Sequence, residues 1–169
     1  MEIHRFEKLW LLASIVLVVS FIATVTYGAV GPGIAMVSDS GGTVDPSNPT
    51  ASDNFREPGV YQTGENEYAV YVLARQFLFE PGTSEPIEVP VDSTVTFYVT
   101  SPDVQHGFNL VGTNVNAMVI PGQVAEFTVQ FEEEKRHSIV CHEYCGSGHH
   151  TMSGNVTVVS QSEFDGGDA

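Results

Sequence analysis

The chain has 169 residues, of which 42% are hydrophobic and 10% aromatic, enough for one compact domain plus additional segments. Its 21 acidic residues outnumber the 6 basic ones, and the resulting formal net charge of −15 argues against a nucleic-acid partner, whose phosphates would be repelled. Such a surface suits a cationic partner or solubility in strong brine, or is simply a solvated acidic face.

Residues 9–30 form an uncharged, largely apolar run near the start of the chain. A helix of about 20 apolar residues crosses the hydrocarbon core of a membrane. Trp10 and Tyr27 lie near the two ends of the run, where aromatic side chains gather at membrane surfaces. A cleaved signal peptide is the alternative, but its apolar region is typically about 7–15 residues long. The run therefore predicts a retained transmembrane helix.

The charges that flank this helix predict its orientation. Arg5 and Lys8 precede it, whereas the segment that follows it is strongly acidic. By the positive-inside rule, residues 1–8 form a cytoplasmic N-terminus. Residues 31–169 then lie on the outer face of the cell membrane.

Two segments beyond the helix have the composition of polar connectors. Ser, Gly, Pro, Asp and Asn are dense from Ser38 to Gly59, and apolar residues there show almost no periodicity. This composition predicts an extended linker over residues 31–59. At the other end of the chain, residues 161–169 are predicted to form an acidic tail.

Residues 60–160 are predicted to form an antiparallel β-sandwich. Residues from Tyr68 to Leu73 follow a strand pattern, and no stretch after the membrane run has the periodicity of a helix. Turn residues such as Pro81-Gly82, Ser101-Pro102-Asp103 and Pro121-Gly122 separate the runs, and many short strands at this spacing are typical of a sandwich. The other predicted strands are Ile87–Val89, Thr94–Thr100, Gly107–Val111, Val124–Phe131, His137–Cys141 and Asn155–Val159.

The two cysteines of the chain, Cys141 and Cys145, lie within a stretch of twelve residues that also contains His149 and ends at Met152. His106 precedes this stretch by 35 residues. Soft sulfur ligands combined with imidazoles select copper over hard cations. One cysteine would suit a single blue copper ion, whereas two thiolates on one loop can each bridge two metals. Each metal then takes one histidine, and Met152 and a backbone carbonyl complete the coordination.

Two other readings of these residues stay open at this point. Zinc takes two cysteines and two histidines in structural sites, although this cysteine spacing is not that of a common finger and Met152 would be idle. A disulfide between Cys141 and Cys145 suits an external protein but leaves His106 and His149 without a role. The remaining histidines are interpreted as structural or surface residues: His4, His137, His142 and His150.

The run C-x-E-x-C-G-x-G-H-x-x-M and the upstream S-P-D-V-x-H-G-F resemble the CuA domain of cytochrome c oxidase subunit II, nearest to the single-helix B-type of archaea and thermophilic bacteria. The resemblance covers nearly the whole chain, including Glu7-Lys8, Gln62-Thr63-Gly64 and Gly112-Thr113-Asn114. It implies a mainly β fold, with one N-terminal transmembrane helix and a cupredoxin-like Greek-key β-sandwich. It also implies the ligands of a dinuclear copper centre: His106, Cys141, Cys145, His149, Met152 and the backbone carbonyl of Glu143.

The same resemblance implies a role in an enzyme complex. The chain is expected to accept electrons from a soluble external donor, cytochrome c or a small blue copper protein. It then passes them to heme in subunit I, where oxygen is reduced. Glu7 matches the mouth of a proton channel in B-type oxidases. Glu143 matches an A-type glutamate that binds an interfacial Mg ion, where B-type members often have Gln.

Three alternative functions are weighed against this one. The copper subunit of a nitric oxide reductase would look nearly the same, and only its partner subunit would differ. A membrane-anchored copper-delivery protein is disfavoured because two bridging thiolates oppose easy release of the metal. The third alternative is a structural external module stapled by zinc or a disulfide.

Overall fold

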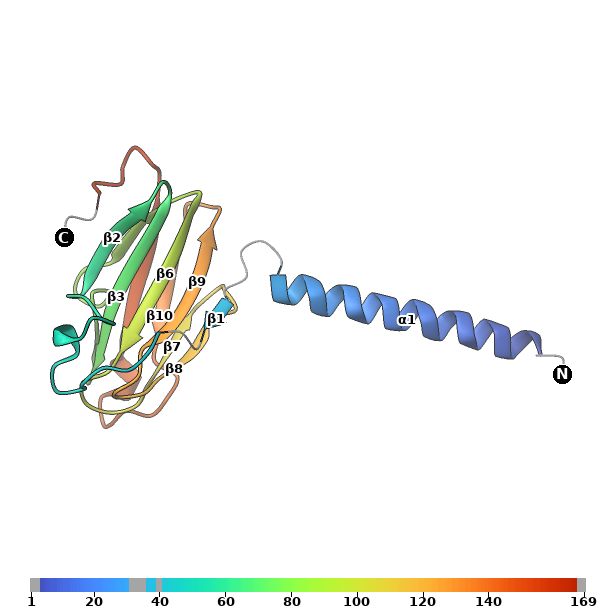
Figure 1. Ribbon diagram of the computed structural model, residues 1–169, viewed down its shortest axis with the longest axis horizontal. Helices are drawn as coiled ribbons and strands as arrows, with labels where there is room; N and C mark the ends of the chain where they lie inside the picture. The colour runs from blue at the N-terminus through green and yellow to red at the C-terminus, as the bar shows by residue number, and fades with distance from the viewer. Residues whose placement is uncertain (1–3, 31–35, 39–40, 167–169) are drawn as a thin grey trace. The chain divides into compact units, whose positions relative to one another are not determined.

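A computed structural model describes residues 4–30, 36–38 and 41–166 of the chain, which divides into two units, residues 1–34 and 35–169. Helix α1 (Arg5–Val30) makes up most of the first unit (Figure 1). By length and composition it is able to cross a membrane. The helix begins at Arg5, ahead of the apolar run predicted from the sequence. Hydropathy marks only the part of a helix that suits lipid, and charged residues also form helices.

Glu7 has a local structural contact at the start of this helix. Its carboxylate accepts a hydrogen bond from the backbone N–H of His4, with 3.0 Å between Oε2 and N. His4 immediately precedes the helix, and Glu7 is its third residue. A glutamate at this position that reaches back to the preceding N–H satisfies one of the unpaired donors of the first turn.

The second unit is a sandwich of two β-sheets (Figure 1). The strands of the first sheet are β1 (Met36–Ser38), β2 (Gly59–Gly64), β3 (Glu67–Arg75), β4 (Leu78–Glu80), β6 (Ser93–Thr100) and β9 (Ala125–Phe131). The strands of the second sheet are β5 (Ile87–Pro90), β7 (His106–Leu110), β8 (Asn116–Val119), β10 (Arg136–Val140) and β11 (Ser153–Val159). Two short 3₁₀ helices are η1 (Pro49–Ala51) and η2 (His149–Thr151). The first sheet has the order β1-β9-β6-β3-β2, with β4 beside β3, and the second has the order β5-β11-β10-β7-β8.

The predicted fold class is confirmed, but the sandwich is not purely antiparallel. Strand β3 runs parallel to β6, and β5 runs parallel to β11. The chain leaves the first sheet after β4, forms β5 in the second sheet, and returns along β6. Because the connection passes through the second sheet, β6 can enter the first sheet in the same direction as β3.

Aromatic and β-branched side chains fill the space between the sheets. Phe97 of β6 and Phe127 of β9 stack with ring centroids 5.3 Å apart, and Phe108 of β7 lies 5.3 Å from Phe127. All three are fully buried, as are Val72 and Ile139. Burial of a side chain of this size contributes about 1.5–3 kcal/mol. The core thereby fixes β7 and β10, the two strands whose ends carry the predicted metal ligands.

Residues 41–58 differ from the predicted extended linker, because they pack on the outer face of the first sheet. Phe55 is 1% exposed and, together with Val44, forms a small second core with Leu73 and Val124. The ring of Phe55 meets that of Tyr71 edge-on, with centroids 5.4 Å apart. The linker prediction was wrong for this part of the chain because isolated apolar residues in a polar segment can still cover an apolar sheet face. Residues 31–35 and 39–40 of the predicted linker lie outside the described part.

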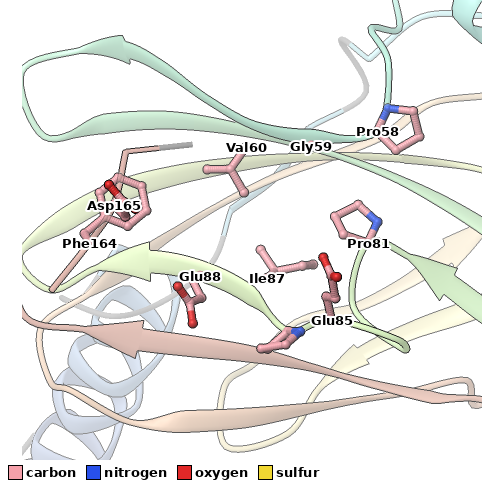
Figure 2. A pocket seen from close by; sticks show the side chains of 10 residues that line it. Pro58, Gly59, Val60, Pro81, Glu85, Ile87, Glu88, Phe164 and Asp165 are labelled. Atoms are coloured by element: carbon pink, nitrogen blue, oxygen red, sulfur yellow. The ribbon is translucent and has the colours of Figure 1, made fainter. Parts of the chain in front are cut away.

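The edge strands β2 and β5 of the two sheets border a groove of about 550 Å³ (Figure 2). Val60 and Ile87 line it, together with three prolines and the ring of Phe164 from the segment after β11. Its carboxylates are those of Glu85, Glu88 and Asp165. None of the predicted metal ligands lines this groove, so the candidate site is separate from it.

Candidate metal centre

The topology of the second sheet brings the predicted ligands to one end of the sandwich. His106 is the first residue of β7, and Cys141 directly follows the last residue of β10. These neighbouring strands are antiparallel, so the start of β7 and the end of β10 lie at the same end of the sandwich. Strand β11 begins there too, because Val140 pairs with Ser153. The loop from Cys141 to Met152 spans the interval between β10 and β11.

The two thiols lie at the centre of this cluster. Ligand atoms of His106, Cys141 and Cys145 all lie within 4.8 Å of one another, and the three residues are buried. The two sulfur atoms are 3.9 Å apart, and Nδ1 of His106 is 3.9 Å from Sγ of Cys141. A disulfide requires about 2.05 Å between sulfurs. Both cysteines are free, and the disulfide reading disagrees with this geometry.

Three further predicted donors approach the same sulfurs. Nδ1 of His149 lies 3.7 Å from Sγ of Cys145, and Sδ of Met152 lies 3.6 Å from it. The backbone carbonyl of Glu143 is 3.2 Å from Sγ of Cys141. The structure therefore brings together all six donors that the sequence singled out, from two segments of the chain.

The spacing of these donors fits a pair of soft metal ions. A thiolate–metal bond is about 2.3 Å, so one metal reaches both sulfurs if they are less than about 4.6 Å apart, and two such positions exist on opposite sides. Adding a bond of about 2.0 Å to an imidazole nitrogen allows about 4.3 Å between nitrogen and sulfur. Each histidine meets that limit with one thiol. Six donors exceed the four of a structural zinc site, and their softness favours copper.

Asp103 orients the buried histidine. Nε2 of His106 donates to Oδ1 of Asp103 at 2.9 Å, which leaves Nδ1 facing Cys141. Burial opposes ionisation of this carboxylate. Hydrogen bonds from the Gln76 backbone N–H, His106, the Val104 N–H and the Ser101 hydroxyl outweigh burial and lower its pKa. A carboxylate that holds the far ring nitrogen fixes the tautomer and the direction of a metal-binding histidine.

The role of Asp103 was not predicted from the sequence. Ser101-Pro102-Asp103 was interpreted as a turn between strands. The available signal was a carboxylate three residues before a histidine, but only the fold shows that the two side chains meet.

The thiol of Cys145 lies in surroundings that favour its protonated form. Burial, together with the neighbouring Cys141, raises the pKa of Cys145 to about 11. The backbone N–H of Gly107 is 3.4 Å from Sγ of Cys141 and donates to it. A metal that binds these sulfurs must displace thiol protons, so binding is coupled to proton release.

The other histidines lie outside the cluster. His142 and His150 are exposed, and so is His4 at the start of α1. His137 is buried, with Nδ1 3.0 Å from the carbonyl of Val111 and its ring against Phe131. These positions agree with their interpretation as structural or surface residues.

A two-sheet sandwich with thiols, imidazoles and a thioether at one end is the architecture of a copper-binding, cupredoxin-like domain. The sequence model of the cytochrome c oxidase subunit II periplasmic domain matches residues 67–159. Cytochrome c oxidase subunit 2 of Thermus thermophilus is 40% identical over 160 residues, which cover 92% of this chain and 93% of that protein. The chain belongs to the cytochrome c oxidase subunit II family.

Two solved structures are similar to the chain. The cryo-EM structure of a heme-copper terminal oxidase dimer contains a chain with a TM-score of 0.64 and 34% identity, covering 92% of this chain and 100% of that one. The periplasmic domain of subunit II of the Bradyrhizobium japonicum oxidase has a TM-score of 0.53 at 23% identity. It covers 57% of this chain and 86% of its own, and supports the fold alone.

Proposed function

We propose that the chain holds a dinuclear copper centre of the CuA kind and is the electron-entry subunit of a heme-copper terminal oxidase. The observation that carries this proposal is the convergence of six soft or carbonyl donors on two sulfurs 3.9 Å apart. The matched relatives are cytochrome c oxidase and heme-copper oxidase subunits, which supports oxygen rather than nitric oxide as the terminal acceptor.

When bound, a copper pair that shares one unpaired electron supplies one-electron transfer with little change in geometry. The residues of the chain create the conditions for this chemistry. Cys141 and Cys145 would hold both metal positions, and their side chains are buried although other residues of the loop are exposed. Asp103 holds His106 in place inside the domain. His149 is half-buried and leaves one side of the centre near the surface.

The proposed path of the electron requires the folded domain to be outside the membrane. Arg5 and Lys8 at the start of α1, ahead of its apolar run, and the acidic residues after the helix support a cytoplasmic N-terminus. The donor is then a soluble external protein, cytochrome c or a small blue copper protein, and the acceptor is heme in subunit I. The acidic surface favours a basic donor whose electron-transfer rate falls as salt rises. A flat or rising curve of rate against salt would instead support adaptation to brine.

Two carboxylates are proposed to act at the boundary with subunit I. Glu7 is proposed to lie at the entry of a proton channel, in addition to its contact with the His4 N–H at the start of α1. Glu143 offers a half-exposed carboxylate, which suits an oxygen-preferring cation such as Mg. An ion pair with a basic residue of subunit I is the competing role for Glu143.

The metal content of the purified full-length chain tests the central proposal. In detergent and reconstituted with copper, it should bind two copper ions per chain and be purple. Electron paramagnetic resonance of the mixed-valence form should show one unpaired electron shared by both nuclei. A blue single-copper spectrum, or full occupancy by zinc alone, contradicts the proposal. Co-purification with a heme-containing subunit that reduces oxygen tests the complex.

A further inference from the structure

Gln76 follows β3 directly and contacts both halves of the metal centre. Its backbone N–H donates to Oδ2 of Asp103 at 2.8 Å, and Oδ1 of the same carboxylate holds His106. Its side-chain Nε2 donates to the backbone carbonyl of Cys145. These two contacts reach residues that are 27 and 69 positions away along the chain. One residue thus joins two segments that carry different ligands.

The carbonyl that Gln76 holds belongs to the turn that carries His149. Gly146 follows Cys145 with φ of +132°, a conformation that favours glycine. The carbonyl of Gly146 accepts a hydrogen bond from the N–H of His149 at 3.1 Å. A Cβ at residue 146 would lie 2.7 Å from Nε2 of Gln76, so the amide packs directly on this glycine. Fixing the peptide after Cys145 therefore fixes the start of the turn.

The ring of Phe77 supports the same turn from the neighbouring position. A Cβ at Gly148 would overlap this ring, so the loop lies flat on Phe77. Packing of this kind positions the loop as a whole but offers no hydrogen bond to a particular carbonyl. The directional contact comes from Gln76, whose amide and backbone N–H point to opposite halves of the centre.

We infer that Gln76 is a positioning residue that sets the spacing between the His106 end and the His149 end of the copper centre. The inference rests on the proposed copper site. The backbone N–H acts through Asp103, and the side chain acts through Cys145. A substitution of the side chain therefore removes the second contact and retains the first, which makes the two effects separable.

The test uses the full-length chain in detergent, reconstituted with copper. Gln76→Met keeps the length of the side chain and removes the donor. Gln76→Glu keeps the shape but places a carboxylate against the carbonyl of Cys145. Since a hydrogen bond of ordinary strength corresponds to about a fivefold change in an equilibrium constant, Gln76→Met should release copper at an about fivefold lower concentration of a competing chelator. Gln76→Glu should release it at a lower concentration still.

The spectrum separates positioning from a general loss of stability. Both variants should still bind two copper ions but share the unpaired electron less equally, with changed hyperfine splitting and a shifted midpoint potential. Gln76→Asn keeps the amide donor and should restore part of the native signal. Gln62→Met is the matched control, because Nε2 of Gln62 donates to the carbonyl of Gly64 at 3.1 Å in β2, which contributes no ligand. It should leave copper release and spectrum unchanged.

The outcomes distinguish this inference from the proposed function. If the unsubstituted chain forms no two-copper centre, the proposed function fails. If it forms one and Gln76→Met matches Gln62→Met in copper release and hyperfine splitting, the inference is overturned. A lower melting temperature of the metal-free chain with an unchanged copper spectrum also overturns it, because the role is then only structural.

Discussion

The two histidines of the metal centre are held in different ways. His106 begins a central strand, is fully buried, and has its far ring nitrogen on Asp103. His149 begins a 3₁₀ turn, is half-buried, and has its ring 5.9 Å from that of Tyr144, which is 73% exposed. The sheet thus fixes the inner end, whereas loop contacts fix the outer end. A centre that exchanges electrons with an external partner needs one accessible end. The half-buried position of His149 provides that end, while contacts still hold both histidines in place.

Removing a thiol should disrupt metal binding at both the inner and the outer end of the centre, which is the largest expected effect. In Cys141→Ser or Cys145→Ser a hydroxyl replaces one of the two thiolates that are proposed to bridge the metals, and a hydroxyl is a poor bridge between soft metals. The purple colour and the shared-electron signal should disappear completely. His150→Ala is the control, because this exposed histidine adjoins His149 but lies outside the cluster. A persistent two-copper spectrum in either serine variant would contradict the bridging assignment.

Weakening the inner end alone should have the next largest effect. Asp103→Asn keeps the shape of the side chain but removes the charge that orients His106. Loss of an outer carboxylate of this kind typically lowers metal affinity about 10–100-fold. Competition with a chelator measures this loss, and Asp53→Asn, at an exposed position away from the site, is the matched control. Equal affinities in the two variants would mean that burial alone orients His106.

The pH should also affect copper binding, through the thiol of Cys145. Because the pKa of Cys145 is raised to about 11, the metal-free thiol is protonated throughout the neutral range and loses its proton to bind copper. The apparent copper affinity should therefore rise about tenfold per pH unit, for this proton alone, between about pH 7.5 and 9. A flat affinity over this range would show that Cys145 is already ionised.

The same raised pKa predicts an opposite trend for the metal-free fold. A thiol whose pKa is higher in the folded state stabilises that state below its ordinary pKa of 9.0. This contribution is lost as pH rises from about 9 to about 11. The free energy of unfolding of the metal-free chain should fall over this window. Cys145→Ser should remove that dependence, and chemical denaturation at several pH values measures it.

The sequence predicted the features that depend on local patterns. Alternation of apolar residues located the longer strands such as β3, β6 and β9, and the clustered cysteines with His149 and Met152 located the metal loop. Strands β1, β2, β4 and β8 were not predicted. Strands β1, β4 and β8 have only three or four residues, and β2 has glycines at both ends and polar residues between, so none carries enough periodicity. Phe55 packs on the sheet from a segment whose polar composition indicated a linker.

Side-chain contacts that depend on how the loops fold were the hardest to predict. The carboxylate of Asp103 meets His106 because the chain bends before β7. The side chain of Gln76 reaches Cys145 because two loops pack against each other. Asp103 shares the run S-P-D-V-x-H-G-F with His106, but the run does not show that their side chains meet, and Gln76 shares no motif with Cys145. Such residues carry no periodic signal, so their roles become visible only when the topology brings the end of β3 to the end of β10.

The smallest expected effect on copper concerns Glu143, whose main chain and side chain are proposed to do different things. Its carbonyl lies 3.2 Å from Sγ of Cys141, so the backbone is available to the metal whatever the side chain is. The half-exposed side chain is free to meet another subunit, where a buried carboxylate is costly unless a cation pairs with it. Glu143→Gln should therefore leave the copper spectrum and midpoint potential nearly unchanged.

Metal analysis of the intact oxidase then separates the two roles of this side chain. If the carboxylate is a ligand of an interfacial Mg ion, Glu143→Gln should remove the bound Mg, or the Mn that replaces it, from the complex. If it pairs with a basic residue of subunit I, the Mg content should stay the same and the subunits should dissociate more readily at high salt. Abolished copper binding in this variant would show that the side chain is itself a ligand, and the assignment of the backbone carbonyl would then be wrong.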